Sequence, residues 1–226
     1  ANELQKQGKY LDAAKMFEKS AQAEKASPSP RMTDLVAALN QAGYLYSLVG
    51  QYDKALKYYE EALAIARKLG QEGLIGTSLN NIGGVYISWG QYDKAIKYFE
   101  EALAIDKKLG QESDIAGDLN NIGNVYLSWG QYDKAIKHFK EALVIVRKLG
   151  QEGYVATCLN NIGSVYDSWG QYDKAIKYYE EALAIDKRLG NEAGVARNLN
   201  NIGTVYDSWG KYDKAIKYYN EALDIV

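Results

Sequence analysis

The chain of 226 residues has little of several residue types that would direct it toward a particular chemistry. Its single cysteine, Cys158, cannot form an internal disulfide, and a partly exposed thiol is expected there. Its single histidine, His138, cannot supply the roughly four ligands of a typical metal site. No leader with a charged and then an apolar segment opens the chain, and no apolar run approaches the roughly 20 residues of a membrane helix. These absences predict a cytoplasmic protein with no membrane partner and no cofactor or metal.

The chain also has no excess of positive charge. Its formal net charge is -2 and its pI is about 5.6, which argues against nucleic acid as a partner. No histidine-supported nucleophile, phosphate-binding glycine loop or paired-carboxylate pocket is visible. The sequence therefore predicts a protein that is not an enzyme.

What the chain does have is internal repetition. The block LNNIGxVYxSWGQYDKAIK begins at Leu79, Leu119 and Leu159, and variant copies begin at Leu39 and Leu199, which gives a period of 40 residues. A period of this size is typical of helical hairpin arrays, armadillo or HEAT repeats and WD40 propellers.

The local apolar pattern decides between these architectures. In the second copy, apolar residues recur at helical spacing, and strand alternation is absent, which excludes the propeller. Each repeat is predicted to hold two helices of roughly 18 residues. In the second copy, Gly90 separates the two helices and Gly110 closes the second one. The residues with helical spacing are Ile75, Leu79, Ile82 and Tyr86.

The repeats predict an all-α chain with a single domain, 1–226. In the third repeat the two helices are expected at about 112–129 and 132–149, within the usual uncertainty of helix ends. A partial repeat at 1–26, which resembles a second helix, precedes a linker at 27–31 that contains both prolines. Five repeats follow, at 32–70, 71–110, 111–150, 151–190 and 191–226.

Seven positions of each repeat carry a family resemblance. In the third repeat they are Leu119, Ile122, Gly123, Tyr126, Ala135, Phe139 and Ala142, and their spacing resembles the tetratricopeptide repeat (TPR) signature. Gly123 and Ala135 leave room for two helices to cross closely. The repeat exceeds the usual length of about 34 residues, and basic residues such as Arg67 replace the usual closing proline, which resembles the LGN/Pins and kinesin-light-chain type and bacterial signalling TPR domains.

This resemblance implies a right-handed α-solenoid, or superhelix, of antiparallel helix hairpins. It also implies a protein-protein interaction scaffold that holds an extended peptide in a concave groove lined by the first helices. Tryptophans such as Trp89 end each first helix, and we interpret them as packing at the turn rather than as ligand contacts.

By the same resemblance, one asparagine of each repeat faces the groove. A ladder of amides could grip a peptide backbone, since each offers a donor and an acceptor. The alternative for the second asparagine of each pair, such as Asn121, is a bond between neighbouring repeats. The ladder consists of Asn40, Asn80, Asn120, Asn160 and Asn200.

Selectivity is expected where the repeats differ along the groove. The first half is apolar and the second half acidic, with Arg197 as the exception. This predicts a partner segment with apolar side chains at one end and basic ones at the other; the alternative is that these are drifting surface positions. Besides Arg197 and the asparagine ladder, the expected groove residues are Tyr44, Leu48, Ile87, Asn124, Leu127, Asp167 and Asp207.

Two other functions stay open at this point. Tyr219, Ala222 and Leu223 end the sequence without a polar terminal helix, which solenoids usually need, so the repeats could stack end to end into a homo-oligomer. The chain could also be the regulatory arm of a larger signalling protein.

Overall fold

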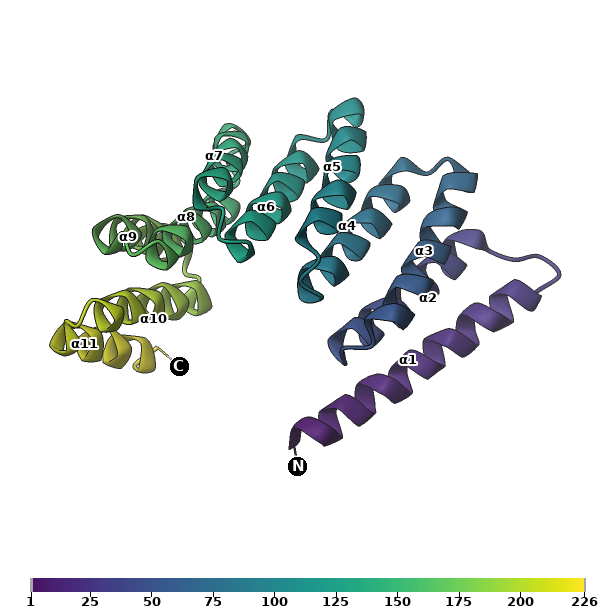
Figure 1. The fold of residues 1–226 in the computed structure, drawn as a ribbon, viewed down its shortest axis with the longest axis horizontal. Coiled ribbons are helices and arrows are strands. Elements are labelled where there is room, and N and C mark those ends of the chain that lie inside the picture. The colour runs from purple at the N-terminus through teal and green to yellow at the C-terminus, as the bar shows by residue number, and fades with distance from the viewer. Residues whose placement is uncertain (1, 226) are drawn as a thin grey trace. The chain divides into compact units, whose positions relative to one another are not determined.

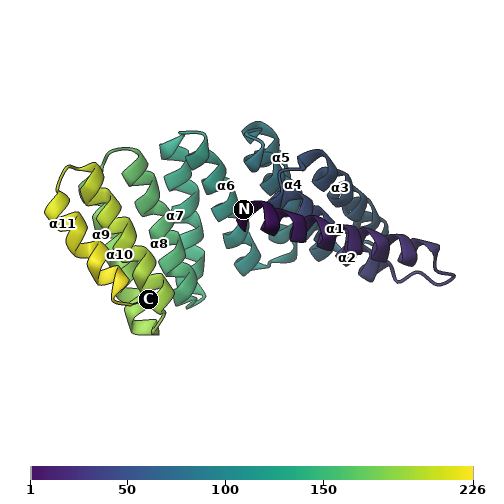
Figure 2. The same ribbon diagram turned by 90° about the horizontal axis from the view of Figure 1, so that it is seen from below.

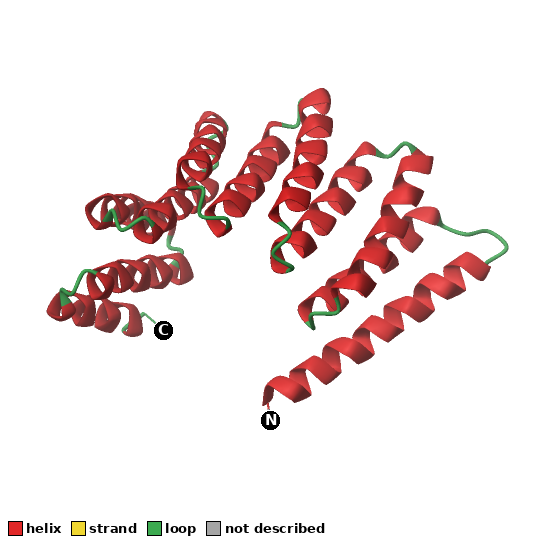
Figure 3. Ribbon diagram, in the orientation of Figure 1, coloured by secondary structure: helices red, strands yellow, loops and turns green. Residues whose placement is uncertain are grey.

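The computed structural model describes residues 2–225, with side chains from residue 6, and all its regular elements in that range are α-helices (Figures 1 and 3). None of these helices is both long and apolar enough to cross a membrane. The helices are α1 (Asn2–Ala26), α2 (Met32–Leu48), α3 (Tyr52–Leu69), α4 (Glu72–Ser88), α5 (Tyr92–Leu109), α6 (Glu112–Ser128), α7 (Tyr132–Lys148), α8 (Glu152–Ser168), α9 (Tyr172–Leu189), α10 (Glu192–Ser208) and α11 (Tyr212–Leu223). The expected helices 112–129 and 132–149 are thereby confirmed to within one residue at each end.

The chain divides into two compact units. Unit 1 comprises residues 1–111 and holds α1–α5, and unit 2 comprises residues 112–226 and holds α6–α11. The division lies one residue from the predicted repeat boundary between 110 and 111. One continuous domain over the whole chain stays a prediction.

Within each unit, consecutive helices form antiparallel hairpins. In unit 1, α2 packs on α3 and α4 on α5, and α1 packs on α2 (Figure 1). In unit 2 the hairpins are α6–α7, α8–α9 and α10–α11, and each second helix also packs on the next first helix (Figure 2). The expected array of helical hairpins is thus present in both units.

Glycine closes the helices where the backbone must turn. Gly110 follows α5 with φ of 69°, and its N–H and that of the next residue bond to carbonyl groups of the last turn. Gly90, between α4 and α5, has φ of 73°. Because only glycine adopts this left-handed conformation without a steric cost, the period of the glycines sets the period of the hairpins.

Another glycine lets the two helices of a hairpin cross closely. A Cβ atom placed on Gly123 would lie 2.7 Å from the ring of Phe139, which is fully buried in the same hairpin. The equivalent pair Gly43 and Tyr59 leaves 2.8 Å. The predicted role of Gly123 in helix crossing is therefore confirmed.

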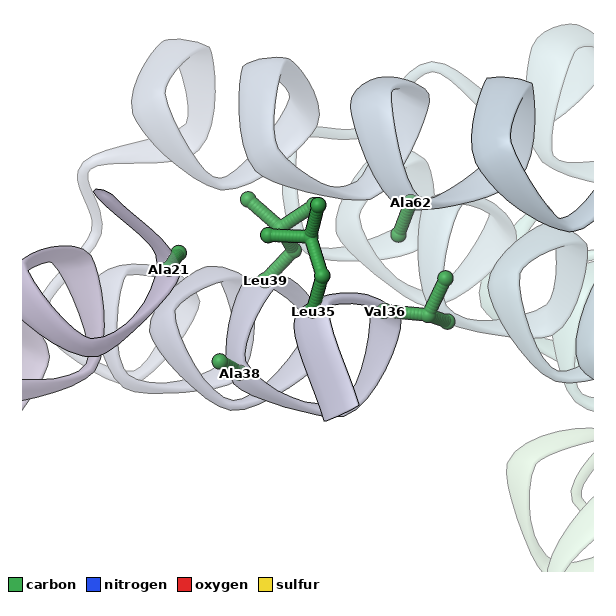
Figure 4. Packing of buried hydrophobic residues seen from close by; sticks show 6 residues of the cluster. All are labelled: Ala21, Leu35, Val36, Ala38, Leu39 and Ala62. Carbon is green, nitrogen blue, oxygen red and sulfur yellow. The ribbon is translucent and has the colours of Figure 1, made fainter. Parts of the chain in front are cut away.

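Small and branched apolar side chains fill the space between α1, α2 and α3. Figure 4 shows this cluster at close range, with residues from all three helices. It ties the partial repeat to the first full hairpin. Its buried members are Ala21, Leu35, Val36, Ala38, Leu39 and Ala62.

The tryptophans pack at the turns, as the sequence predicted. Trp89 stacks on Tyr86 of its own helix, with ring centroids 6.4 Å apart, and lies 6.0 Å from Tyr52 of the preceding hairpin. Trp169 repeats the arrangement with Tyr166 and Tyr132. The indole rings therefore join consecutive hairpins.

Ion pairs show that α1 occupies the position of a second helix. Arg67 of α3 pairs with Glu101 of α5 at 2.5 Å, and Lys25 of α1 pairs with Glu61 of α3. Such exposed pairs contribute only about 0–1 kcal/mol each. They show, however, that α1 stands to α3 as α3 stands to α5, which is the position of a second helix.

Candidate peptide-binding faces

The first helices expose one side in each unit, and we call these surfaces the first-helix faces. In unit 1 the face belongs to α2 and α4, which contact each other, and in unit 2 it belongs to α6, α8 and α10. The expected site residues divide accordingly. Unit 1 holds Asn40, Tyr44, Leu48, Asn80 and Ile87, and unit 2 holds Asn120, Asn124, Leu127, Asn160, Asp167, Arg197, Asn200 and Asp207.

The first-helix face of unit 1 presents apolar side chains. Tyr44 and Leu48 on α2 are 52% and 45% exposed, and Ile87 on α4 is half-buried. Beneath them, burial raises the pKa of Tyr59 to about 12, although a hydrogen bond with Ser47 opposes the shift. The face therefore offers apolar contact area, and none of the five expected site residues of unit 1 is acidic.

The first-helix face of unit 2 presents hydroxyl and carboxyl groups. The hydroxyl oxygens of Tyr179 and Ser164 lie 3.0 Å apart, and Tyr219 donates to Thr204 at 3.2 Å. Asp167 on α8 is half-buried, and burial raises the pKa of its carboxyl group.

The charge of Asp167 also affects the pKa of the buried Tyr179. The pKa of Tyr179 rises to about 12, mainly because the ring is buried, and the Asp167 carboxylate adds to the shift while the Ser164 hydrogen bond opposes it. Asp207, on α10, is exposed. The two carboxyl groups make this part of the face acidic.

Tyr179 and Tyr219 are not among the site residues expected from the sequence. A signal was present, because tyrosine at this position accompanies Ser164 or Thr204 on the first helix. Phenylalanine takes the position in the repeats with Gly84 and Asn124. A hydroxyl on one helix therefore accompanies a hydroxyl on the other.

The asparagines of the ladder are largely engaged with neighbouring hairpins in unit 2. Oδ1 of Asn120 accepts a hydrogen bond from Asn161 at 3.2 Å, and Oδ1 of Asn160 accepts one from Asn201 at 3.4 Å. Nδ2 of Asn160 donates to Asn198 at 2.6 Å. The alternative in which the second asparagine bonds between repeats is confirmed for Asn161 and Asn201.

Exposure varies along the ladder. Asn160 is buried, Asn40, Asn80 and Asn120 are half-buried, and Asn200 is exposed. Amides that already bond across a junction have less capacity left for a peptide backbone. Asn200 is the ladder residue whose side chain is most accessible.

Arg197 is the expected exception to the acidic character of unit 2. Its guanidinium lies 3.9 Å from Asp186, whose carboxylate is buried and also accepts hydrogen bonds from Asn191 and Asn198. Arg197 itself is exposed. Its positive charge is therefore partly balanced by a buried acid.

Cys158 is fully buried, which corrects the expectation of a partly exposed thiol. Its position in α8 corresponds to that of Asn198 in α10, which bonds to Asp186 on the preceding second helix. Positions that face a neighbouring helix in this way are shielded from solvent. Burial raises the pKa of the Cys158 thiol, and a hydrogen bond with Asn120 opposes the shift. No group of three or more potential metal ligands occurs in the described part of the chain.

Antiparallel hairpins at a period of 40 residues, crossed at a glycine and an aromatic ring, define a helical-hairpin repeat protein. The tetratricopeptide repeat family model matches residues 1–68, 34–108, 115–188 and 170–226. The chain belongs to the tetratricopeptide repeat family. Repeats of this family are generally non-enzymatic protein-interaction modules, and the fold of the chain is that of a protein-interaction scaffold.

Solved structures show the same fold. BtubC (BKLC) from P. vanneervenii is 27% identical, with a TM-score of 0.79 over 97% of this chain and 90% of that one. A putative kinesin light chain from Podosopora anserina, with nearly identical TPR-like repeats, is 19% identical, with a TM-score of 0.68 over 84% and 94%. A Rap protein complexed with Competence and Sporulation Factor is 17% identical, with a TM-score of 0.64 over 97% and 71%. None of the curated proteins compared matches the sequence.

Proposed function

We propose that the chain binds an extended peptide segment of a partner protein on its first-helix faces. The observation that carries this proposal is the contrast between the faces. Unit 1 exposes Tyr44 and Leu48, whereas unit 2 places carboxyl groups at Asp167 and Asp207. A partner with apolar side chains for the first and basic side chains for the second fits this contrast.

The fold gives general support to such a role. The Rap protein that shares the fold was solved in complex with a factor, so hairpin arrays of this kind accommodate bound partners. The asparagine ladder adds backbone contacts where its amides remain accessible, at Asn200 above all.

A binding assay on selected peptides tests the acidic part of the proposal. Peptides displayed on phage are selected on the intact chain, and a fluorescent copy of the best one is titrated by anisotropy. We expect enrichment of lysine and arginine, and about tenfold or greater weakening in Asp167→Lys with Asp207→Lys, since each reversal replaces attraction by repulsion.

The matched control carries the same charge change elsewhere. Glu141 and Asp224 are exposed and lie outside the first helices, so Glu141→Lys with Asp224→Lys alters net charge equally. Equal weakening in both double variants would show a general electrostatic effect. Undiminished capture of the basic peptide by the Asp167 and Asp207 variant would reject the acidic face as its site.

A second candidate function rests on α11. Ile216 and Leu223 are 58% and 71% exposed, whereas the equivalent Ile176 and Leu183 of α9 are 7% and 9% exposed. We propose, as the alternative, that a second copy of the chain covers this surface. Multi-angle light scattering over a range of concentrations tests it, and Ile216→Lys should abolish any concentration-dependent increase in mass. A constant monomer mass at high concentration would exclude it.

A further inference from the structure

Within each unit, the junctions between consecutive second helices share a pair of stacked tyrosines. At the junction of α1 and α3, the rings of Tyr46 and Tyr58 lie 5.7 Å apart, and both hydroxyl groups donate to the carboxylate of Glu18 on α1. Burial and this carboxylate raise the pKa of Tyr46 to about 12. The two tyrosines thus form a small carboxylate-binding site, and the side chain of Glu18 occupies it.

An acid occupies the same position at two further junctions. Glu60 of α3 corresponds to Glu18. Burial raises the pKa of Tyr86, and the charges of Tyr98 and Glu60 add to the shift. Glu180 of α9 acts in the same way on Tyr206, where burial is again the larger cause. The acid beside the tyrosine pair is therefore a regular feature of these junctions.

The junction of α7 and α9 breaks this pattern, because Lys140 stands where the others have glutamate. The rings of Tyr166 and Tyr178 stack with centroids 5.5 Å apart, the same distance as between Tyr86 and Tyr98. Among the described residues, the hydrogen bonds from both tyrosines to one carboxylate occur at Glu18, whereas at the α7–α9 junction a lysine stands at that position. The ring pair is preserved, and its acid is missing.

A pocket of about 560 Å³ lies at this junction, and we call it the α7–α9 pocket. The corresponding pocket between α3 and α5 has about 540 Å³. Their charges differ, since the α7–α9 pocket has four basic residues and one acid, whereas the other has three basic residues and two acids. The α7–α9 pocket is lined by Lys140, Leu143, Val144, Arg147, Leu159, Tyr166, Lys174, Lys177, Tyr178 and Glu181.

Two of the four basic residues are already engaged. Arg147 pairs with Glu181 at 2.6 Å, and Lys174 donates to Gln171 and lies 5.2 Å from the ring centroid of Tyr166. Lys140 and Lys177 have no acidic partner within 4.0 Å among the described residues. They leave positive charge in the pocket that Tyr166 and Tyr178 also line.

We propose that the α7–α9 pocket binds the carboxylate of a glutamate or aspartate from an acidic segment of a partner protein. The chain shows the chemistry at Glu18, where two stacked tyrosines donate to one carboxylate. In the α7–α9 pocket, Lys140 replaces the resident acid, so the carboxylate comes from outside and meets an additional cation. Val144, 68% exposed at a position where the other full repeats have alanine or aspartate, provides apolar contact for the methylene groups of the incoming side chain.

The α7–α9 pocket shares no lining residue with the expected groove residues of unit 2. Leu159 and Tyr166 of α8 line the pocket, but its lysines belong to the second helices, whereas Asp167 and Asp207 belong to first helices. The unit would thus take basic side chains on one set of helices and acidic ones on the other. Either proposal can fail without the other.

The probe is a fluorescein-labelled hexaglutamate peptide, titrated by anisotropy against the full chain at two salt concentrations. Lys140→Glu restores the resident acid of the other junctions and should weaken binding about tenfold or more, because a charge-assisted bond becomes a repulsion. Tyr178→Phe removes one hydroxyl donor and should also weaken binding. Lys137→Glu, the same charge change at an exposed position of α7 outside the pocket, should change affinity by about twofold or less.

A converse variant asks whether the pocket can be transplanted. Glu60→Lys gives the junction of α3 and α5 the residue of the α7–α9 pocket and should add a second bound peptide per chain. Circular dichroism confirms that each variant is folded.

Three outcomes would overturn the proposal: no binding of hexaglutamate, equal weakening by Lys137→Glu and Lys140→Glu, or binding of a phosphoserine peptide alone. The last outcome would identify a phosphate site in place of a carboxylate site.

Discussion

Asn160 donates a hydrogen bond from Nδ2 to Oδ1 of Asn198 at 2.6 Å, and its own Oδ1 accepts one from Asn201 at 3.4 Å. The three amides connect α8 to α10, so a residue expected to grip a peptide holds two hairpins together. Asn198 continues the network to the buried Asp186 on α9 at 2.7 Å. These contacts make the junction of two repeats partly polar.

Replacing Asn160 should therefore affect folding more than binding. Asn160→Ala leaves Oδ1 of Asn198 without its donor in a buried setting, and we expect a loss of about 1–3 kcal/mol in the free energy of unfolding. Asn200→Ala changes an exposed amide at the equivalent position and should cost less than about 0.5 kcal/mol. Urea unfolding followed by circular dichroism measures both. Similar losses in the two variants would contradict the role assigned to Asn160.

The repeat unit could be predicted from the sequence, because its positions are fixed by backbone and packing demands. The turn glycines and the pair of Gly123 and Phe139 leave few alternatives, so helix ends agree to within one residue.

Contacts between repeats could not be predicted in the same way. A pair of asparagines has the same letters whether it faces a peptide or another helix. The burial of Cys158 likewise depends on which helix lies opposite. The sequence shows that Lys140 replaces a glutamate. The consequence of this replacement can be inferred only from the structure, in which Glu18 accepts hydrogen bonds from two tyrosines.

The close crossing of helices predicts a sharp difference between two glycines of α6. Gly123→Ala places a methyl group 2.7 Å from the ring of Phe139, whereas a Cβ on Gly117 meets nothing within 4 Å. We expect Gly123→Ala to destabilise by about 1–3 kcal/mol through overpacking. Gly117→Ala should stabilise by about 0.5–1 kcal/mol, because alanine is the better helix former. Thermal unfolding of both variants provides the comparison, and a Gly123 variant as stable as the parent would show that the ring can move aside.

The raised pKa of Asp167 predicts a pH dependence with a definite sign. Because burial disfavours the carboxylate, the folded state binds the proton more tightly than the unfolded state does. The stability tied to this protonation is fully present below the ordinary aspartate pKa of about 3.9 and is lost as the pH rises through the raised value. Asp167→Asn should therefore raise the midpoint of thermal unfolding at pH 7, with a smaller gain at pH 3. A lower midpoint at pH 7 would show that the carboxylate has a stabilising partner.

Asp207 provides the control for this experiment, since it is exposed on the equivalent position of α10. Asp207→Asn should leave the midpoint nearly unchanged at both pH values. The same two variants, titrated with a basic peptide, separate the cost of the charge for folding from its benefit for binding.

The hydroxyl of Tyr179 should determine part of the alkaline stability of unit 2. Its pKa is raised to about 12, against about 10 for tyrosine in an unfolded chain, so the folded state retains its proton over this interval. The corresponding stability is fully present below pH 10 and is lost as the pH rises toward 12. In Tyr179→Phe, the free energy of unfolding should fall less steeply between pH 10 and 12.

At neutral pH, the free energy of unfolding of Tyr179→Phe should be lower by about 0.5–1.5 kcal/mol, because the hydrogen bond with Ser164 is lost. Phe139 occupies the equivalent position of another repeat, so the ring without a hydroxyl fits this site. Parallel alkaline slopes in the two proteins would place the retained proton on another group.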